Sequence, residues 1–305
     1  MQRRPSSMLS ILIPVYCFDI RPLVQQLWQQ AQALPFPWEI RLLDDASPTQ
    51  WQATNRELST LSGVEYAEQA QNSGRAQIRN TLAKSARYEY LLFMDCDSAA
   101  PDDQFLERYT KHLSPRTVLC GGRTYLEAPA KTNEHLHWWY GSQREVKSAA
   151  TRQKRPYEGF MTNNYLVPKS IALDIPFDPT LQHYGHEDTL FGLELKRHNI
   201  NIIHLDNPLL HIGLEEADHW LDKQQQAIRN LYILHRQHPD LETRALRLWT
   251  WLHNSGFLGW LYPLLKRRAP LWRKRLTQET RPSLRLLDSL KIFWLEQVWR
   301  EESVK

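Results

Sequence analysis

The stretch that decides the fold is YLLFMDCDS, residues 90–98. Its first five residues are apolar or aromatic, and two carboxylates follow, Asp95 and Asp97, one residue apart. A short apolar run bounded by polar residues is typical of a buried strand, and open α/β sheets bind ligands at the carboxyl ends of their strands. The two acids are therefore expected at a site, although a D-x-D pair alone more often marks an acidic turn that caps the next helix.

Carboxylates at a strand end suit a hard divalent cation, because Mg²⁺ and Mn²⁺ take one or two of them and fill other positions with substrate phosphates. A second acidic pair, Asp44 and Asp45, ends the strand expected from residue 38. The ends of parallel strands point the same way, so both pairs are expected to face one crevice. The alternative is that one member of the second pair only caps the following helix.

Strands and helices alternate along the first third of the chain. Strands are expected over residues 9–15, 38–43, 63–68 and 90–94, and helices over 21–33, 47–61 and 74–86. Further strands are expected over 117–125, 160–168 and 200–205, and further helices over 101–112, 185–198 and 218–238. This alternation predicts an α/β fold, with a Rossmann-like, mostly parallel sheet flanked by helices. No G-x-G-x-x-G follows the first strand, which argues against a dinucleotide-dependent enzyme.

Composition places the chain among ordinary globular proteins. Apolar residues make up 42% and charged residues 24% of the 305, and no run of 18 uncharged apolar residues occurs. The three cysteines have no paired short spacing, which argues against a disulfide framework or a structural zinc site and fits a reducing compartment. We therefore expect a cytoplasmic protein without a spanning helix, or one held at the inner face of the cell membrane.

Residues 244–305 differ from the rest of the chain. They carry 13 Lys and Arg against five Asp and Glu, and six of the 12 tryptophans. Their net charge of +8 leaves −4 for residues 1–243, because the whole chain carries +4. Basic, Trp-rich amphipathic helices are typical of peripheral membrane contact; packing onto the body and a homodimer interface are the alternatives. The acidic body and the lack of a recognised module argue against nucleic-acid binding.

Five ordered motifs resemble those of the family 2 glycosyltransferases, which have the GT-A fold. They are SILIPVY (10–16), LLDDASP (42–48), NSGRAQIRN (72–80), LLFMDCDS (91–98) and GHEDTLFGLELKRHN (185–199). The resemblance spans about residues 9–241. It implies one transferase domain over residues 1–243, with a nucleotide-sugar half to about 125 and an acceptor half over about 126–243. Residues 244–305 would form a helical, Trp-rich basic extension.

The resemblance also implies roles for individual residues. Pro14 and Tyr16 would line the base pocket, and Asp45 would accept the N3–H of uracil or another base. The donor-binding set it implies is Pro14, Tyr16, Asp45, Asn72, Gly74, Arg79 and Asp95. Arg79 lies four residues after Arg75 at a helix start, where arginines can hold phosphate; a solvated helix face is the alternative.

Sugar transfer needs positive charge to neutralise the leaving diphosphate and a base to take the proton of the acceptor hydroxyl. Mn²⁺ or Mg²⁺ at Asp97 would bridge the leaving diphosphate. His211 is a second candidate ligand, because imidazole commonly binds metals; a histidine satisfied in a strand-end loop is the alternative. Asp188 would take the acceptor hydroxyl proton from the opposite face, which gives inversion, and Glu187 would orient Asp188 or contact the acceptor. Without the other motifs, these last two acids would only indicate the first turn of a helix.

Four residues are expected on the acceptor side, where the partner is a glycan or a lipid-linked glycan. Asn163 and Asn164 offer amides to sugar hydroxyls, or else form a turn. His186 flanks the catalytic pair, and Trp138 would stack on a sugar or pack in the core. The preferred donor is UDP-linked.

Two other functions agree less well with the sequence. A sugar nucleotidyltransferase needs a glycine-rich phosphate loop after the first strand, which YCFD (16–19) does not supply. A non-catalytic glycan-binding protein is disfavoured by the joint presence of Asp45, Asp95, Asp97 and Asp188.

Overall fold

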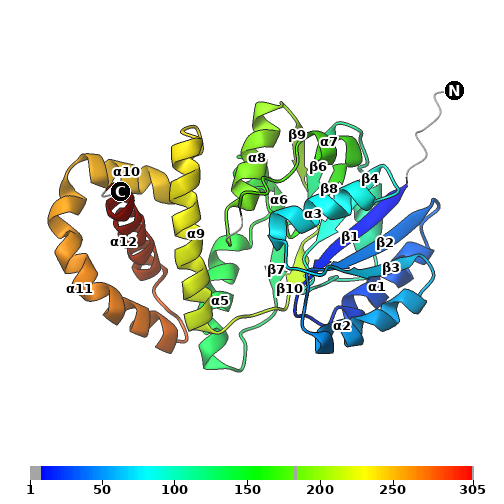
Figure 1. Ribbon diagram of the computed structural model, residues 1–305, viewed down its shortest axis with the longest axis horizontal. Coiled ribbons are helices and arrows are strands. Elements are labelled where there is room, and N and C mark those ends of the chain that lie inside the picture. The colour runs from blue at the N-terminus through cyan, green and yellow to red at the C-terminus, as the bar shows by residue number, and fades with distance from the viewer. Residues whose placement is uncertain (1–7, 182–183, 304–305) are drawn as a thin grey trace. The chain divides into compact units, whose positions relative to one another are not determined.

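The computed structural model describes residues 8–181 and 184–303. Its elements fall into two compact units (Figure 1). Unit 1 comprises residues 1–125, 146–182 and 187–213, and unit 2 comprises residues 126–145, 183–186 and 214–305. The predicted boundary after residue 243 is a different division and stays a prediction.

Within the described residues, unit 1 contains a seven-stranded sheet of order β3-β2-β1-β4-β8-β6-β9 (Figure 1). Its strands are β1 (Leu9–Val15), β2 (Trp38–Asp44), β3 (Val64–Glu68), β4 (Tyr90–Met94), β6 (Thr117–Cys120), β8 (Asn164–Pro168) and β9 (Asn201–His204). β8 pairs antiparallel with β4 and β6, and the other pairings are parallel. The predicted mostly parallel α/β sheet is confirmed. Because β2 and β4 both run parallel to β1, their acidic ends lie at the same edge.

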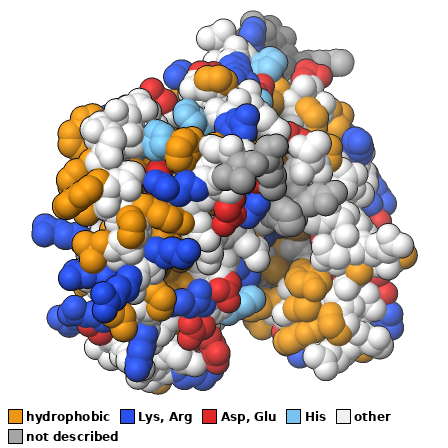
Figure 2. Space-filling model, turned by 60° about the vertical axis from the view of Figure 1, so that its left-hand side comes forward, with side chains coloured by type: hydrophobic (Ala, Val, Ile, Leu, Met, Phe, Trp, Pro, Cys, Tyr) orange, Lys and Arg blue, Asp and Glu red, His pale blue; other side chains and the backbone are white. Residues whose placement is uncertain are grey.

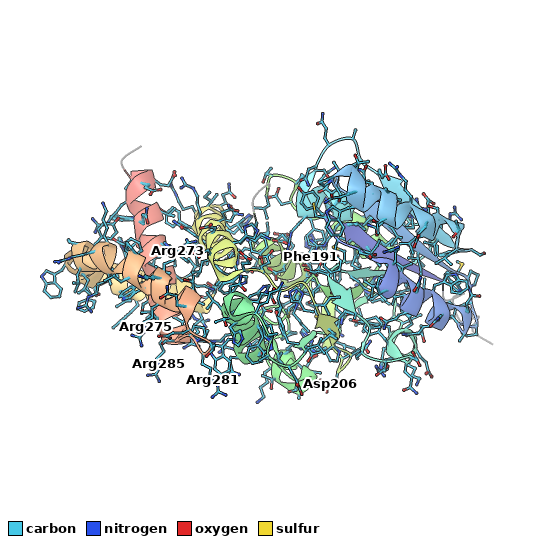
Figure 3. All side chains as sticks on the ribbon, turned by 90° about the horizontal axis from the view of Figure 1, so that it is seen from below. Phe191, Asp206, Arg273, Arg275, Arg281 and Arg285 are labelled. Carbon is cyan, nitrogen blue, oxygen red and sulfur yellow. The ribbon has the colours of Figure 1, made fainter. Side chains whose placement is uncertain are left out.

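Helices cover both faces of this sheet. They are α1 (Arg21–Gln32), α2 (Thr49–Asn55), α3 (Gly74–Ser85), α4 (Phe105–Thr110), α6 (Ala149–Gln153), α7 (Lys169–Asp174) and α8 (Glu187–Arg197). Alternate residues of β1 enter two cores: Leu9 and Ile11 belong to the cluster that includes α1, and Leu12 to the one that includes α3. A strand covered on both faces needs a nearly continuous apolar run, and Ser10 is the one polar residue of β1. In the second core, Phe191 of α8 (labelled in Figure 3) stacks on Phe177 with ring centroids 4.4 Å apart.

The single strand expected over residues 117–125 is wrong, because Gly121 and Gly122 interrupt it and divide it into two short strands. Gly122 has φ +88°, which favours glycine. A Cβ there would lie 2.7 Å from the Arg152 guanidinium, so the position is also too tight for a side chain. The chain after the break, β7 (Arg123–Tyr125), joins a small second sheet with β10 (Leu209–His211) and β5 (Ser98–Ala99). This sheet brings residues from three distant segments together beside the end of β4.

Other expected bounds are also wrong. The helix expected from residue 101 begins only at Phe105. The strand expected from residue 160 begins only at Asn164, and the helix expected from residue 185 begins at Glu187. His186, just before that helix, has φ +69°. A left-handed residue cannot continue a right-handed helix, so the first turn starts one residue later.

Unit 2 is helical in the part that the structure describes. Its helices are α5 (His135–Tyr140), α9 (Ala217–Gln237), α10 (Arg244–Asn254), α11 (Phe257–Gln278) and α12 (Leu284–Ser303). The predicted helical C-terminal extension is therefore confirmed. Part of its tryptophan content is core, since Trp249 and Trp294 are buried. Among the described helices, none is both long enough and apolar enough to cross a membrane.

Candidate active site

Asp45, just after β2, ties the end of that strand to the start of α3. Its Oδ1 accepts hydrogen bonds from the Ser73 amide (2.7 Å) and hydroxyl (2.9 Å), and its Oδ2 accepts one from the Gly74 amide (3.0 Å). The Asn72 side chain donates to the Asp45 backbone oxygen (3.0 Å). The residues predicted to bind the donor here thus come from two loops, after β2 and before α3, that these hydrogen bonds hold together. A carboxylate has about four lone-pair positions, so Asp45 keeps acceptor capacity for a base N–H.

Asp44, the other acid of this pair, has a structural task. It is fully buried; its Oδ1 accepts the Ser47 amide (2.6 Å) and its Oδ2 accepts the Tyr66 hydroxyl (3.0 Å). The Ser47 hydroxyl in turn accepts the backbone amide of Cys17 at the end of β1 (2.9 Å). Asp44 therefore fixes the turn, and only Asp45 remains for the site.

The end of β1 lies beside Asp45, whose amide donates to the Val15 oxygen (2.8 Å). Tyr16 follows, and it is 54% exposed. Pro14 is partly exposed and pairs with Leu43 of β2. The structure thus places an accessible aromatic ring next to the Asp45 loop, where a planar base can stack.

Asp95 is held by two arginines. Its Oδ1 accepts a bond from Arg79 (2.8 Å) and its Oδ2 accepts one from Arg123 (3.4 Å). Arg79 is only 2% exposed, and its other terminal nitrogen lies 3.8 Å from Oε1 of Glu187. Arg75, on the same helix but half-exposed, lies 3.7 Å from that oxygen. This row of ion pairs joins the end of β4 to the start of α8. The donor contact predicted for Arg79 stays a prediction.

The small sheet sets Asp97 beside His211. Ser98 of β5 pairs with His211 of β10, and the Ile212 amide donates to the Asp97 backbone oxygen (2.9 Å). As a result, His211 Nδ1 lies 3.5 Å from Asp97 Oδ1. Gly213 closes the arrangement, because a Cβ there would lie 2.6 Å from the Asp97 Cβ. The close approach of the two candidate ligands depends on this glycine.

The surroundings of Asp97 favour its charged form. Burial raises the pKa of Asp97, but the His211 imidazole, and then the charges of Arg123 and Arg75, outweigh burial and hold it below its ordinary value. Its Oδ1 is buried and, among the described residues, accepts no hydrogen bond within the usual range. An anionic oxygen in that position is the type of atom that a divalent cation binds.

The residues fit a Mg²⁺ or Mn²⁺ ion that shares its coordination with a substrate. In the part of the chain that the structure describes, no group of three or more His, Cys, Asp or Glu forms a complete protein cage. Asp97 can supply one carboxylate ligand and His211 one imidazole ligand. Such ions typically complete their coordination with substrate phosphates and water.

Glu187 and Asp188 occupy the first turn of α8. Asp188 Oδ1 accepts the amide (2.7 Å) and the hydroxyl (3.3 Å) of Thr189. Burial, and then the negative charge of Glu187, raise the pKa of Asp188 to about 6. A carboxylate whose pKa lies near the working pH can both accept and release a proton, as a general base must.

Asn163 and Asn164 lie inside the fold. Asn164 is fully buried; its amide donates to the backbone oxygens of Gly122 (3.0 Å) and Asn207 (2.8 Å) and accepts the Tyr109 hydroxyl (2.6 Å). A contact with an acceptor would require these bonds to break. Asn163 is nearly buried, and its backbone oxygen accepts the Asp95 amide (3.1 Å). Both asparagines therefore support the end of β4.

The other two residues predicted for the acceptor lie in unit 2. Trp138, on α5, donates its indole N–H to the Leu126 oxygen (2.9 Å), and its ring is tilted against Trp139 with centroids 5.9 Å apart. His186 precedes α8 in the chain and belongs to unit 2. Their acceptor roles stay predictions.

The model of the family Glycosyl transferase family 2 matches residues 10–167, which is more than half of the chain and includes β1, the Asp45 loop and the D-x-D pair. This chain belongs to that family. It is therefore a glycosyltransferase, as the motifs predict, and the nucleotidyltransferase and non-catalytic alternatives are not supported.

Individual relatives of this glycosyltransferase are distant. Chondroitin synthase of Escherichia coli is 24% identical over 185 residues, which cover 60% of this chain and 25% of that protein. The chain thus spans a quarter of the length of this relative. The mannosyltransferase PcManGT of Pyrobaculum calidifontis, solved in complex with GDP-Man and Mn²⁺, has a TM-score of 0.51 at 13% identity, covering 72% of this chain and 61% of its own. Residues 1–349 of S. aureus TarS have a TM-score of 0.50 at 18% identity, and the match covers 97% of this chain and 92% of the TarS chain. The predicted GT-A fold is confirmed.

Two residues of the glycosyltransferase site were missed by sequence reasoning, Arg123 and Gly213. Arg123 reaches Asp95, 28 positions earlier in the chain, and Gly213 packs on Asp97. A signal was present for the second, because a glycine two residues after the predicted ligand His211 suggests a close approach. For Arg123 the only hint was the Gly-Gly pair before it.

Proposed function

We propose that this chain is an inverting glycosyltransferase that moves a sugar from a nucleotide-sugar donor, UDP-linked, to a hydroxyl of a glycan or lipid-linked glycan. The observation that carries the proposal is the Asp95–Arg79–Glu187 charge chain, with 2.8 Å and 3.8 Å separations. It brings the donor-side strand end and the turn that carries Asp188 to one place. Membership of the family supports the reaction class.

The donor would lie along the ends of β1, β2 and β4. Asp45 would accept the N–H of the base, with Tyr16 and Pro14 against the ring and Asp95 on the ribose or sugar. Arg75, half-exposed at the start of α3, would neutralise charge on the diphosphate. The structural neighbour solved with GDP-Man supports a nucleotide-sugar donor of this general kind.

Asp97 and His211 would hold Mn²⁺ or Mg²⁺, the cations that their donor atoms suit. When bound, the ion supplies positive charge to the departing diphosphate. The neighbour solved with Mn²⁺ supports this cofactor. Arg123, which donates a hydrogen bond to Asp95, would also help to keep Asp97 ionised, because its charge lowers the pKa of that carboxyl.

In the transfer step, the acceptor oxygen forms a bond to the anomeric carbon from the face opposite the diphosphate. The bond from that carbon to the phosphate oxygen breaks, and the nucleoside diphosphate leaves with the electron pair. The hydroxyl proton passes to the Asp188 carboxylate. Glu187, held by Arg75 and Arg79, fixes the turn that presents Asp188. Attack opposite the leaving group inverts the anomeric centre.

The test replaces the base. Asp188→Asn keeps the shape of the side chain but cannot take a proton, so we expect kcat to fall about 10²–10⁴-fold. UDP affinity, measured by calorimetry with Mn²⁺ present, should change little. Glu194→Gln on the same helix is the control, because Glu194 pairs with Arg197 and His198 near the other end of that helix. Unchanged transfer by Asp188→Asn, with any sugar nucleotide that the native protein uses, would remove Asp188 from this role.

A further inference from the structure

α10 and α11 have outward surfaces that are apolar and basic together. Residues 244–278, which form both helices, contain eight Lys and Arg and no Asp or Glu. Large apolar side chains on these helices are exposed to solvent: Leu248, Trp251, Phe257, Trp260, Leu264 and Leu271. Trp260 is 78% and Trp251 68% exposed. Figure 2 shows basic and hydrophobic side chains interleaved on the face that it turns toward the viewer.

The apolar residues of α11 form one stripe along the helix. They are Phe257, Trp260, Leu264 and Leu271. At 3.6 residues per turn, these positions fall within roughly 60° of one another around the axis. The buried positions Leu258 and Leu276 lie on a different side. The stripe is thus separate from the face that packs into unit 2.

Basic side chains border the stripe. Arg267, Arg268 and Lys274 are exposed, and none has an ion-pair partner among the described residues. Arg275, which Figure 3 labels on α11, has one ion-pair partner in the part of the chain that the structure describes, Glu279 four residues on. Arg273 is different, because it turns to Asp218 and Asp222 of α9. The helix therefore uses one arginine for packing and leaves several positive charges in solvent.

We propose that this face of α10 and α11 docks the protein on a membrane that contains anionic phospholipids. The Trp and Leu side chains would enter the headgroup region, and the arginines and lysine would meet lipid phosphates, as in interfacial amphipathic helices. The surface goes beyond the proposed transfer reaction. It would place the protein where a lipid-linked acceptor is found.

The charge and the side chains of this face favour an anionic membrane over a second copy of the chain and over single-stranded nucleic acid. A two-fold dimer would bring the same basic face of both copies together, and these like charges repel. Single-stranded nucleic acid stacks its bases on aromatic rings, but the stripe also exposes Leu264 and Leu271, which offer no ring. A bilayer accepts aliphatic, aromatic and cationic side chains at once.

The test is sedimentation of the full chain with vesicles. We expect binding to vesicles of phosphatidylglycerol and phosphatidylcholine at 0.1 M salt, little binding to phosphatidylcholine alone, and release at high salt. Each Lys or Arg near an anionic surface strengthens binding about fivefold. The triple variant Arg267→Gln, Arg268→Gln, Lys274→Gln should therefore bind about 100-fold more weakly. Trp251→Ser with Trp260→Ser should weaken binding also at low salt.

The matched control removes three exposed charges from unit 1, as Lys84→Gln, Arg116→Gln and Lys154→Gln. It should bind as the native protein does. Equal loss in both triple variants would overturn the proposal in favour of net charge alone. The proposal also fails if anionic vesicles do not sediment the protein, if the stripe variants only abolish a dimer seen by light scattering, or if single-stranded RNA binds more tightly than vesicles. Sedimentation needs no sugar transfer, so these outcomes are independent of the proposed reaction.

Discussion

At the scale of single residues, Asp188 links the pH dependence of activity to its surroundings. A base must be ionised, and burial with the charge of Glu187 puts the pKa of Asp188 at about 6. We therefore expect kcat/KM to fall tenfold per pH unit below about 6. Glu187→Gln removes the negative neighbour, so the pKa should drop and the acid limb should move to lower pH by about 0.5–1 unit. Glu194→Gln should leave the limb in place; an unmoved limb in Glu187→Gln would contradict the coupling.

The raised pKa of Asp188 should also lower the stability of the protein at neutral and alkaline pH. Its pKa is raised from 3.8 to about 6 in the folded state, so the folded protein disfavours the charged form. Its stabilising contribution is full below pH 3.8 and is lost as the pH rises through 6. Asp188→Asn should thus raise the free energy of unfolding more at pH 8 than at pH 4, by about 1–3 kcal/mol. Urea unfolding at the two pH values measures this, and an equal effect at both would contradict the shifted pKa.

The positions of the acids could be predicted from sequence, but their orientations could not. Asp95 and Asp97 follow an apolar run, so strand alternation alone places them at a site edge. Nothing local shows that Asp44 turns inward, because its partner Tyr66 lies 22 residues away on β3. Likewise Asp95 is held by Arg79 and Arg123, which are 16 and 28 residues distant. Side-chain partners far apart in the chain follow only from the packed structure.

At the scale of elements, the small sheet β5-β10-β7 determines where Asp97 and His211 meet. Gly213 permits their approach, since a Cβ there would lie 2.6 Å from the Asp97 Cβ. We expect Gly213→Ala to displace Asp97 and to remove the gain in UDP affinity that Mn²⁺ gives, measured by titration calorimetry with and without the ion. Gly259→Ala is the matched control, because the nearest atom to its added Cβ is 4.0 Å away. Mn²⁺-dependent UDP binding that survives Gly213→Ala would count against this site.

The sequence predicts strands that have an apolar run of their own, but it does not predict short strands that pair with a distant part of the chain. β1 and β4 are nearly continuous apolar runs, and β2 mixes apolar residues with charged ones; each of the three is predicted to within about a residue of its observed bounds. The stretch after residue 117 looked like one strand because its residues have strand propensity. It breaks at Gly121, and β7 pairs with β10, more than 80 residues later. Short strands whose partners are remote leave little trace in a local pattern.

At the scale of the whole molecule, the helices of the tail do not stand apart from α9. Tyr232 of α9 packs edge-on against Trp249 of α10, with centroids 5.9 Å apart, and Arg229 pairs with Glu301 and Glu302 of α12. The change in composition at residue 244 predicts a domain boundary there, and that boundary stays a prediction. Composition reports the charge of a surface, whereas a boundary depends on which buried faces are shared.

Removing residues 244–305 should therefore damage unit 2 instead of releasing an intact transferase domain. Leu231 and Leu234 of α9 are buried, and a chain ending at residue 243 loses α10, α11 and α12 from unit 2. We expect this truncation to aggregate or to lose its cooperative thermal transition, in calorimetry beside the native chain. Arg229→Gln is the control for the surface ion pairs, which typically contribute less than about 1 kcal/mol. A truncated chain that melts cooperatively at the native temperature would instead establish the boundary at residue 243, because α9 would then need no cover from the tail.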